Sequence, residues 1–148
     1  VIDVVNRLLE IIKPHTIFLG IKDYQQLTLI KMHINKNKIK TKVIACSTIR
    51  GINGVALSSR NSKLSKNQIK IASNVFKYIK KNKKYFFSKY IKRKKIEFIN
   101  KIKLLGVRKI DYLEYLNLKT LKSPQNKKEN YNVFIAFYIG KVRMIDNL

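Results

Sequence analysis

The feature that most constrains this chain is an apolar run that ends at a glycine and continues into an amphipathic segment. Residues 16–19 read Thr-Ile-Phe-Leu, and Gly20 is followed by Ile-Lys-Asp-Tyr-Gln-Gln. From Asp23 to about residue 35, apolar side chains recur at helical spacing. A strand, a glycine turn and a helix in this order are typical of an open α/β sheet, which binds ligands at the carboxyl ends of its strands.

The turn itself carries groups that suit an anion. Backbone N–H groups and a helix N-terminus favour negative charge, and Lys22 adds a mobile cation that suits a phosphate. Asp23 can cap the helix or accept a hydrogen bond from a ribose hydroxyl, and Gln26 lies one turn later on the same face. The alternative is an ordinary strand–helix turn with an exposed lysine, and this stretch alone does not separate the two interpretations.

Residues 1–48 are predicted to form one domain. A helical apolar pattern over residues 1–12 precedes the run at 16–19, and alternating residues at 39–45 predict a second strand. The order helix, strand, helix, strand favours a parallel sheet with right-handed crossovers. We therefore expect this domain to be the trailing part of a doubly wound α/β fold.

Residues 49–148 are predicted to form a second, smaller α+β domain. The two domains are joined by a long connection at 47–64, for which the sequence predicts no regular secondary structure. A Ser-x-x-Gln capping box at 65–68 opens one helix, and a second helix at 87–105 is expected to end at Gly106. Three β-rich segments then predict a small antiparallel sheet packed on the two helices: 109–116, 133–139 and 142–145.

The net charge of +25, from 33 basic and 8 acidic residues, raises the question of a nucleic-acid partner. The excess is almost all lysine, spread along the chain beside abundant isoleucine and asparagine, as an A/T-rich gene would produce. We interpret it as drift of surface charge and keep a basic nucleic-acid-binding module as the alternative. The basic, aromatic stretch at 85–95 could stack on a single strand, but a solvated helix face with buried rings is the preferred interpretation.

Several classes of site are disfavoured by the residues present. His15 and His33 stand alone, and the single cysteine, Cys46, has no neighbouring ligand, so the sequence predicts no metal-binding residues. The few acidic residues are scattered, which argues against a paired-carboxylate hydrolase. No apolar run approaches the length of a membrane span, and one cysteine fits a cytoplasmic protein.

What remains is a candidate phosphate site in two pieces. Lys22 supplies the first piece, and Ser58, Ser59 and Arg60 supply the second from the long connection. Hydroxyl groups and a guanidinium are good partners for a polyphosphate, because arginine can bind two of its oxygens at once.

Both pieces resemble motifs of the pantoate–β-alanine ligase family. The family pattern F-G-E-K-D-Y-Q-Q-L is matched at residues 19–27, where Leu19 replaces the phenylalanine. The pattern R-E-x-D-G-L-A-M-S-S-R-N-x-x-L is matched at 50–64. A D-Y-x-E strand motif is similar to residues 111–114, and the closing 143–147 also fit, so the resemblance covers essentially the whole chain in order and spacing.

The resemblance implies a fold and a reaction. Residues 1–48 would be the trailing part of a Rossmann-like nucleotidyltransferase domain that binds ATP and pantoate, and 49–148 an α+β domain whose loop 49–61 closes over ATP. ATP, assisted by Mg²⁺, would activate pantoate as an acyl-adenylate, which β-alanine then attacks to give pantothenate. The family is usually a cytoplasmic homodimer.

The resemblance also assigns the site residues. Lys22, Ser58, Ser59 and Arg60 would stabilise the phosphates during catalysis. Gln26 would hold pantoate. The residues in contact with ATP would be Gly20, Ile21, Lys22, Asp23, Ile49, Leu57, Ser58, Ser59 and Arg60.

Some residues depart from the family pattern. Ile21 and Gly51 replace glutamates, Asn53 replaces an aspartate and Ser47 replaces a proline. The family's H-x-G-H motif and a second pantoate-binding glutamine belong to a leading half that this sequence does not contain. We therefore expect either part of an active ligase or an inactive remnant of one.

Overall fold

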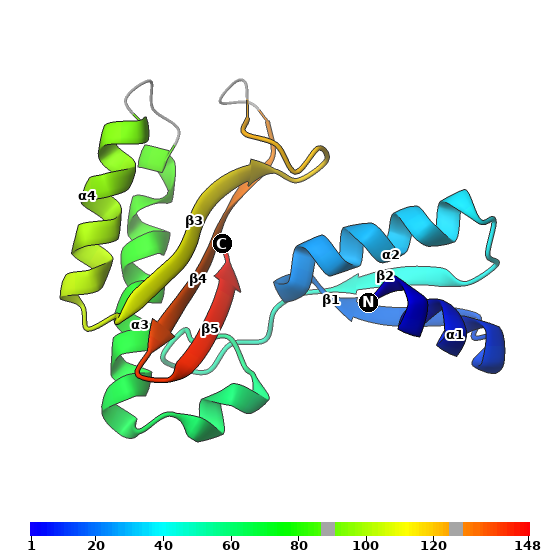
Figure 1. Ribbon diagram of the computed structural model, residues 1–148, viewed down its shortest axis with the longest axis horizontal. Coiled ribbons are helices and arrows are strands. Elements are labelled where there is room, and N and C mark those ends of the chain that lie inside the picture. Colours follow the sequence, from blue (N-terminus) through cyan, green and yellow to red (C-terminus); the bar gives the residue numbers. More distant parts are fainter. Residues whose placement is uncertain (87–90, 125–128) are drawn as a thin grey trace. The chain divides into compact units, whose positions relative to one another are not determined.

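The computed structural model describes residues 1–86, 91–124 and 129–148 (Figure 1). The chain divides into two compact units, Val1–Thr48 and Ile49–Leu148, called unit 1 and unit 2 below. Among the described residues, no helix is long and apolar enough to cross a membrane.

Unit 1 is a helix–strand–helix–strand unit, as the sequence predicts. Its elements are α1 (Ile2–Ile12), β1 (Thr16–Gly20), α2 (Tyr24–Lys36) and β2 (Lys42–Cys46). The strands pair in parallel, from Thr16 opposite Lys42 to Gly20 opposite Cys46. Both carboxyl ends therefore lie at one edge of the sheet, which is the edge that carries the turn after Gly20.

The second strand begins later than its alternation predicts. Ile39 donates its N–H to the Ile34 carbonyl at 3.0 Å and so completes the end of α2 instead of entering the sheet. Pairing with β1 begins at Lys42, and Ala45 is exposed while Val43 and Ile44 are half-buried. The inward alternation is thus present from Ile39 to Val43 and fails at Ala45. The strand starts later than predicted because the end of the preceding helix uses the first residues of the pattern.

The apolar face of α1 is mostly uncovered in unit 1. Leu9 is buried with Ile30 and Ile34 of α2, but Leu8 and Ile12 are 50% and 64% exposed. Phe18 on β1 is 66% exposed. Parallel sheets are normally covered on both faces, so unit 1 carries apolar surface that its own residues do not bury.

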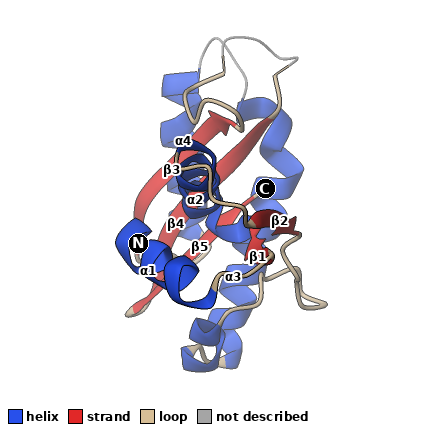
Figure 2. Cartoon of the chain, turned by 90° about the vertical axis from the view of Figure 1, so that its right-hand side faces the viewer, coloured by secondary structure: helices blue, strands red, loops and turns tan. Residues whose placement is uncertain are grey.

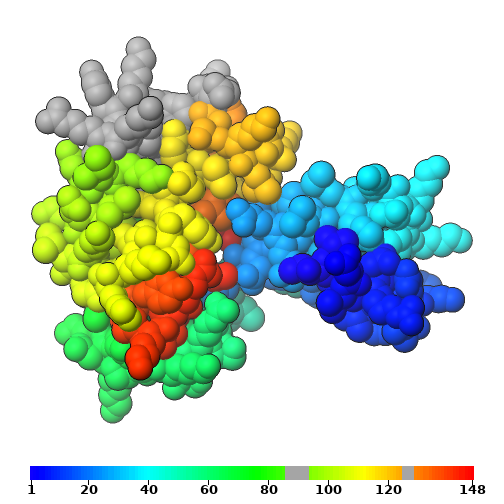
Figure 3. All heavy atoms as spheres, in the orientation of Figure 1, coloured from blue at the N-terminus to red at the C-terminus, as the bar shows by residue number. Residues whose placement is uncertain are grey.

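Unit 2 packs two helices on one face of an antiparallel sheet (Figures 1 and 2). The strand order is β3–β4–β5, with β4 in the centre and β5 at the surface of the unit (red in Figure 3). This is the predicted α+β arrangement, with 3-10 helices at Ser59–Lys63 and Lys83–Phe86. The principal elements are α3 (Lys66–Asn82), α4 (Ile91–Leu104), β3 (Lys109–Asn117), β4 (Tyr131–Ile139) and β5 (Val142–Asn147).

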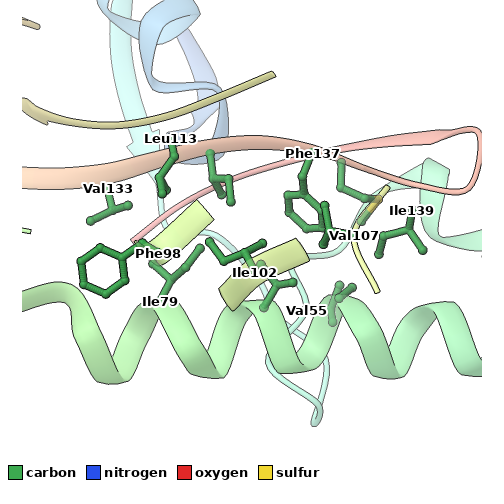
Figure 4. Close-up of a cluster of buried hydrophobic side chains, with 13 residues drawn as sticks. Val55, Ile79, Phe98, Ile102, Val107, Leu113, Val133, Phe137 and Ile139 are labelled. Carbon is green, nitrogen blue, oxygen red and sulfur yellow. The ribbon is translucent and has the colours of Figure 1, made fainter. Parts of the chain in front are cut away.

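The core of unit 2 lies between this sheet and the helices (Figure 4). Ile79 of α3, Ile102 of α4 and Val133 of β4 are fully buried in it. Each such side chain contributes roughly 1.5–3 kcal/mol on burial. Val55 joins the same cluster from the connection that precedes α3, so this connection is anchored in the core.

The predicted helix ends in unit 2 are confirmed where the structure describes them. Ser65 and Gln68 form the capping box, and Gly106 has a φ of +103°, which suits glycine. The basic stretch at 85–95 falls partly on residues 87–90, which lie outside the described residues. Tyr85 is 46% exposed, so the expectation of buried rings is wrong at this residue.

Candidate phosphate site

The first predicted loop follows β1 directly. Gly20 is extended, with φ −69° and ψ 133°, and the chain enters a 3-10 helix at Ile21–Asp23 before α2 begins. Lys22 is half-buried within this short helix. The predicted arrangement of strand, glycine turn and helix is therefore present, and it places Lys22 at the carboxyl edge of the sheet.

Asp23 and Gln26 lie on the outside of this turn. Asp23 occupies the position before α2, but its carboxylate makes no capping hydrogen bond and is exposed. Of the two roles expected for Asp23, capping the helix is therefore wrong. Gln26 is exposed at the wall of a cavity of about 230 Å³, whose other lining residues are apolar and come from α1, α2 and β1 with Pro14.

The second predicted loop is more ordered than the sequence indicates. Residues 49–57 form a small hairpin, in which the Leu57 N–H donates to the Ile49 carbonyl at 2.9 Å and Arg50 pairs with Ala56. Gly54 turns the chain with a φ of +82°. The connection, which lies wholly within the described residues, thus contains no strand or α-helix, as expected, but backbone hydrogen bonds within the segment close it into a hairpin.

The residues predicted to bind phosphate follow this hairpin: Ser58 precedes a 3-10 helix, Ser59–Lys63, which contains the other two. The Ser58 hydroxyl accepts the Arg60 N–H at 3.2 Å, and its own O–H remains a donor. Ser59 and Arg60 are exposed. Asn61 donates its side-chain amide to the Ala56 carbonyl at 3.1 Å and so connects this turn to the hairpin.

The predicted residues divide between the two units. Unit 1 contains Gly20, Ile21, Lys22, Asp23 and Gln26. Unit 2 contains Ile49, Leu57, Ser58, Ser59 and Arg60. The members in unit 1 lie in or just after one turn. In unit 2, the hydrogen bond from Leu57 to the Ile49 carbonyl brings Ile49 to residues 57–60, so the structure brings together the members of each group.

The site residues predicted from the sequence do not include Arg50, which the structure indicates as a functional candidate. Its guanidinium donates to both carboxylate oxygens of Asp146, at 2.7 and 2.9 Å, from a side chain that is only 22% exposed. These residues stand 96 positions apart, so spacing gives no signal of the pair. The only available signal is that Arg50 begins the second motif and Asp146 lies in the matching tail.

The departure at Asn53 leaves the hairpin ordered. Its side-chain oxygen accepts the Val55 N–H at 3.0 Å, and its carbonyl accepts the Ser73 hydroxyl at 2.7 Å. An aspartate could make the same side-chain bond, so an asparagine here preserves the turn.

The histidines, the cysteine and the acidic residues, for which the sequence predicts no metal site, can also be located. Across residues 1–86, 91–124 and 129–148, no group of three or more His, Cys, Asp or Glu side chains could hold a metal ion. His33 lies 2.8 Å from the Asn6 side-chain oxygen, which gives the ring a structural partner. Cys46 is a free, half-buried cysteine at the end of β2.

Comparison with known proteins agrees with the order of these motifs. The family profile described as pantoate-beta-alanine ligase matches residues 1–148. This chain belongs to the pantoate–β-alanine ligase family. The resemblance found in the two loops is thereby confirmed over the full length of the chain.

Relatives in the family are about twice as long as this chain. The pantothenate synthetase of Azobacteroides pseudotrichonymphae is 38% identical over 150 residues, which cover 100% of this chain and 54% of the relative. That of Francisella tularensis subsp. novicida is 40% identical over 144 residues, covering 97% and 47%. The chain therefore spans about half the length of the curated relatives it matches and corresponds to their carboxyl-terminal half.

A solved family structure has the same fold. The pantoate-beta-alanine ligase of Francisella tularensis, solved with beta-gamma ATP and beta-alanine, superposes with a TM-score of 0.77 at 38% identity. The match covers 99% of this chain and 48% of that one. The α/β fold, with a parallel sheet and a separate three-stranded antiparallel sheet, is thus that of the family.

Proposed function

We propose that this chain supplies the carboxyl-terminal half of the active site of an ATP-dependent pantoate–β-alanine ligase. The observation that carries the proposal is the family match over residues 1–148, with both predicted phosphate segments in the family's order. In the reaction, a pantoate carboxylate oxygen attacks the α-phosphorus of ATP and pyrophosphate leaves. The β-alanine amine then attacks the acyl carbonyl, which gives pantothenate and releases AMP.

Both predicted segments would contribute phosphate contacts. Lys22 would contact the phosphates from the turn after β1, where the edge of the sheet and the start of α2 favour negative charge. The Ser58 and Ser59 hydroxyls and the Arg60 guanidinium would bind the departing pyrophosphate. These groups act by stabilising charge that develops as the bond to the α-phosphorus breaks.

The remaining ATP contacts would orient the nucleotide. Gly20 and Ile21 offer backbone groups at the turn, and the exposed carboxylate of Asp23 is available to the ribose. In unit 2, Ile49 would lie against the adenine, and Leu57 would precede the phosphate-binding residues. Ile49 is 72% exposed and Leu57 57% exposed, which leaves apolar surface for a ligand.

Gln26 would hold pantoate. Pantoate combines hydroxyl groups with a branched apolar carbon, and Gln26 is an amide at the wall of an otherwise apolar cavity. An amide can bind a hydroxyl while the apolar wall accommodates the methyl groups.

Mg²⁺ would enter as the ATP complex. It is a hard cation that binds phosphate oxygens and water with few protein ligands. This agrees with the lack of an acidic cluster among the described residues. Its positive charge would add to that of Lys22 and Arg60 on the phosphates.

The family resemblance also suggests the domain type, the cellular location and the oligomeric state. The parallel sheet of unit 1 would be part of a Rossmann-like domain in a cytoplasmic enzyme that forms a homodimer. Light scattering on the complete enzyme measures its mass, and a monomer would contradict the dimer.

The deciding experiment is pantoate-dependent exchange of labelled pyrophosphate into ATP. A chimera would join the leading half of the Francisella tularensis relative to Val1, and circular dichroism would verify that it folds. Exchange that requires pantoate supports the ligase. No exchange from a folded chimera would indicate an inactive remnant, and tight, salt-sensitive oligonucleotide binding would then favour the basic nucleic-acid-binding module.

Lys22→Ala in this chimera tests the central residue. We expect exchange to fall by about 100-fold or more, because one preorganised charge on a transferring phosphate is worth that much. Lys31→Ala, an exposed lysine on α2, is the matched control and should retain normal exchange. An unchanged rate in the Lys22 variant would remove this residue from the mechanism.

A further inference from the structure

The hairpin at 49–57 leads directly into residues 58–60, which are proposed to bind phosphate. Contacts that fix the hairpin therefore also fix the position of residues 58–60. Leu57 is hydrogen bonded to Ile49 at the residue before Ser58, and the Asn61 amide returns to Ala56. Residues 58–60 are thus attached at both ends to the hairpin.

Arg50 is the principal anchor of this hairpin. Its guanidinium makes four hydrogen bonds: two to the Asp146 carboxylate, one to the Gly54 carbonyl and one to the Asn147 carbonyl, the last two at 3.1 Å. Its Cζ also lies 4.6 Å from the centre of the Phe76 ring. One side chain therefore joins the hairpin to β5 and to α3, with the two-oxygen geometry that arginine alone provides.

The turn of the hairpin is held against α3 as well. The Ser73 hydroxyl donates to the Asn53 carbonyl, and an added Cβ at Gly54 would lie 2.3 Å from a Phe76 ring carbon. The hairpin therefore packs closely against α3. Among the described residues, the ion pair between Arg50 and Asp146 is the only one that holds the hairpin.

We infer that Arg50 and Asp146 are positioning residues that fix residues 58–60 in the geometry needed for phosphate binding. The inference rests on the proposed function, since it gives residues 58–60 their ligand. Neither side chain needs to touch substrate. Their effect is to remove the freedom of the hairpin before ATP binds, and a displacement of about 1 Å in such a segment can cost on the order of 100-fold in rate.

Amide hydrogen exchange on the 148-residue chain, without the leading half of the chimera, tests the anchor directly. Asp146→Asn removes the negative charge but keeps the shape of the side chain. Arg50→Lys keeps the positive charge but cannot donate to both carboxylate oxygens with the geometry of a guanidinium. In both variants the Leu57 and Gly51 amides should exchange at least about tenfold faster, while amides in the middle of α3 stay protected. Hairpin amides that exchange at the wild-type rate would overturn the inference.

Asp111→Asn is the matched control. Asp111 also pairs with an arginine of β5, because it accepts from the Arg143 Nε at 2.7 Å, but this pair includes no residue of the hairpin. The control should leave the hairpin amides unchanged. If it loosens them equally, the effect belongs to general stability and the inference fails.

Kinetics of the folded chimera separate positioning from simple stabilisation. The Asp146→Asn and Arg50→Lys variants should lower kcat for pyrophosphate exchange by about 10- to 100-fold and leave the KM for pantoate within about twofold. A lower unfolding midpoint with normal kcat would show a merely structural pair. A wild-type chimera without exchange activity would contradict the proposed function, and the amide measurement would still decide whether the anchor exists.

Discussion

At the scale of single residues, Asp111 on β3 shows how local charge sets a measurable pH dependence. Its carboxylate accepts from Arg143 and lies 3.3 Å from the Lys109 ammonium. The hydrogen bond from Arg143, followed by that from Lys109, holds the pKa of Asp111 below its ordinary value of 3.8. The charged form is therefore favoured in the folded chain.

The sign of the resulting pH dependence follows from this lowered pKa. The contribution of Asp111 to stability is present above 3.8 and is lost as the pH falls through the lower folded value. We expect urea midpoints of the wild type and Asp111→Asn to differ at about pH 6 and to converge as the pH falls through the lowered pKa of Asp111. A difference that stays constant over this range would contradict the lowered pKa.

The residues that depart from the family pattern have different consequences. Asn53 keeps the hydrogen bond to Val55, so its lost charge does not disorder the hairpin. Ile21 lies in the 3-10 turn beside Lys22, where a glutamate would have brought a negative charge. Its replacement makes the turn more positive, which agrees with binding a polyphosphate.

At the scale of elements, the start of α3 shows a case in which the sequence pattern is sufficient. The Ser65 hydroxyl accepts the Gln68 N–H at 3.3 Å, and the Gln68 side-chain oxygen accepts the Ser65 N–H at 2.9 Å. Both partners lie within four consecutive residues, so their spacing alone predicts the cap.

Ser65→Ala should destabilise unit 2 by about 1 kcal/mol, because it leaves the Gln68 N–H without its capping partner. Urea unfolding followed by helical circular dichroism measures the change. Ser123→Ala, an exposed serine outside any helix, is the control and should remain within about 0.5 kcal/mol of the wild type. Equal effects of the two substitutions would mean that the cap adds nothing.

β2 shows the opposite case at the same scale. Its alternation predicts a strand from residue 39, but Ile39 is committed to the end of α2 and the N–H of Lys42 donates to the His15 carbonyl at 2.8 Å. The start of the strand is therefore decided by a partner 27 residues earlier, which the local pattern does not contain.

At the scale of the whole molecule, unit 1 leaves apolar side chains on α1 and β1 in contact with water. Val1, Val4, Ile11 and Phe18 are each more than 60% exposed. Exposed apolar surface of this kind favours association with another polypeptide. The relatives' additional half is the occupant that we expect.

A hydrophobic dye provides the test of this expectation. The chain alone should bind anilinonaphthalene sulfonate strongly, and the chimera with the leading half should bind much less. Phe18→Thr, which keeps a residue suited to a strand, should weaken dye binding by the chain alone. A chain that binds no dye, or a chimera that binds as much, would contradict coverage of this surface.

The sequence by itself determined the local features of this protein. The strand–turn–helix around Gly20, the capping box at Ser65, the antiparallel strands and the two family motifs each depend on residues close together in the chain. Their physical causes are turn geometry, side-chain periodicity and short-range hydrogen bonds, and all of these can be read from spacing. The family match confirms the resemblance that these motifs carry.

Only the tertiary structure decided how the second motif is held. Arg50 meets Asp146 because the order β3–β4–β5 brings the end of the chain beside the hairpin, across 96 positions of sequence. The same packing buries Val55 and places Phe76 under Gly54. Burial and long-range pairing depend on which surfaces meet, and a sequence pattern specifies the surfaces without specifying their partners.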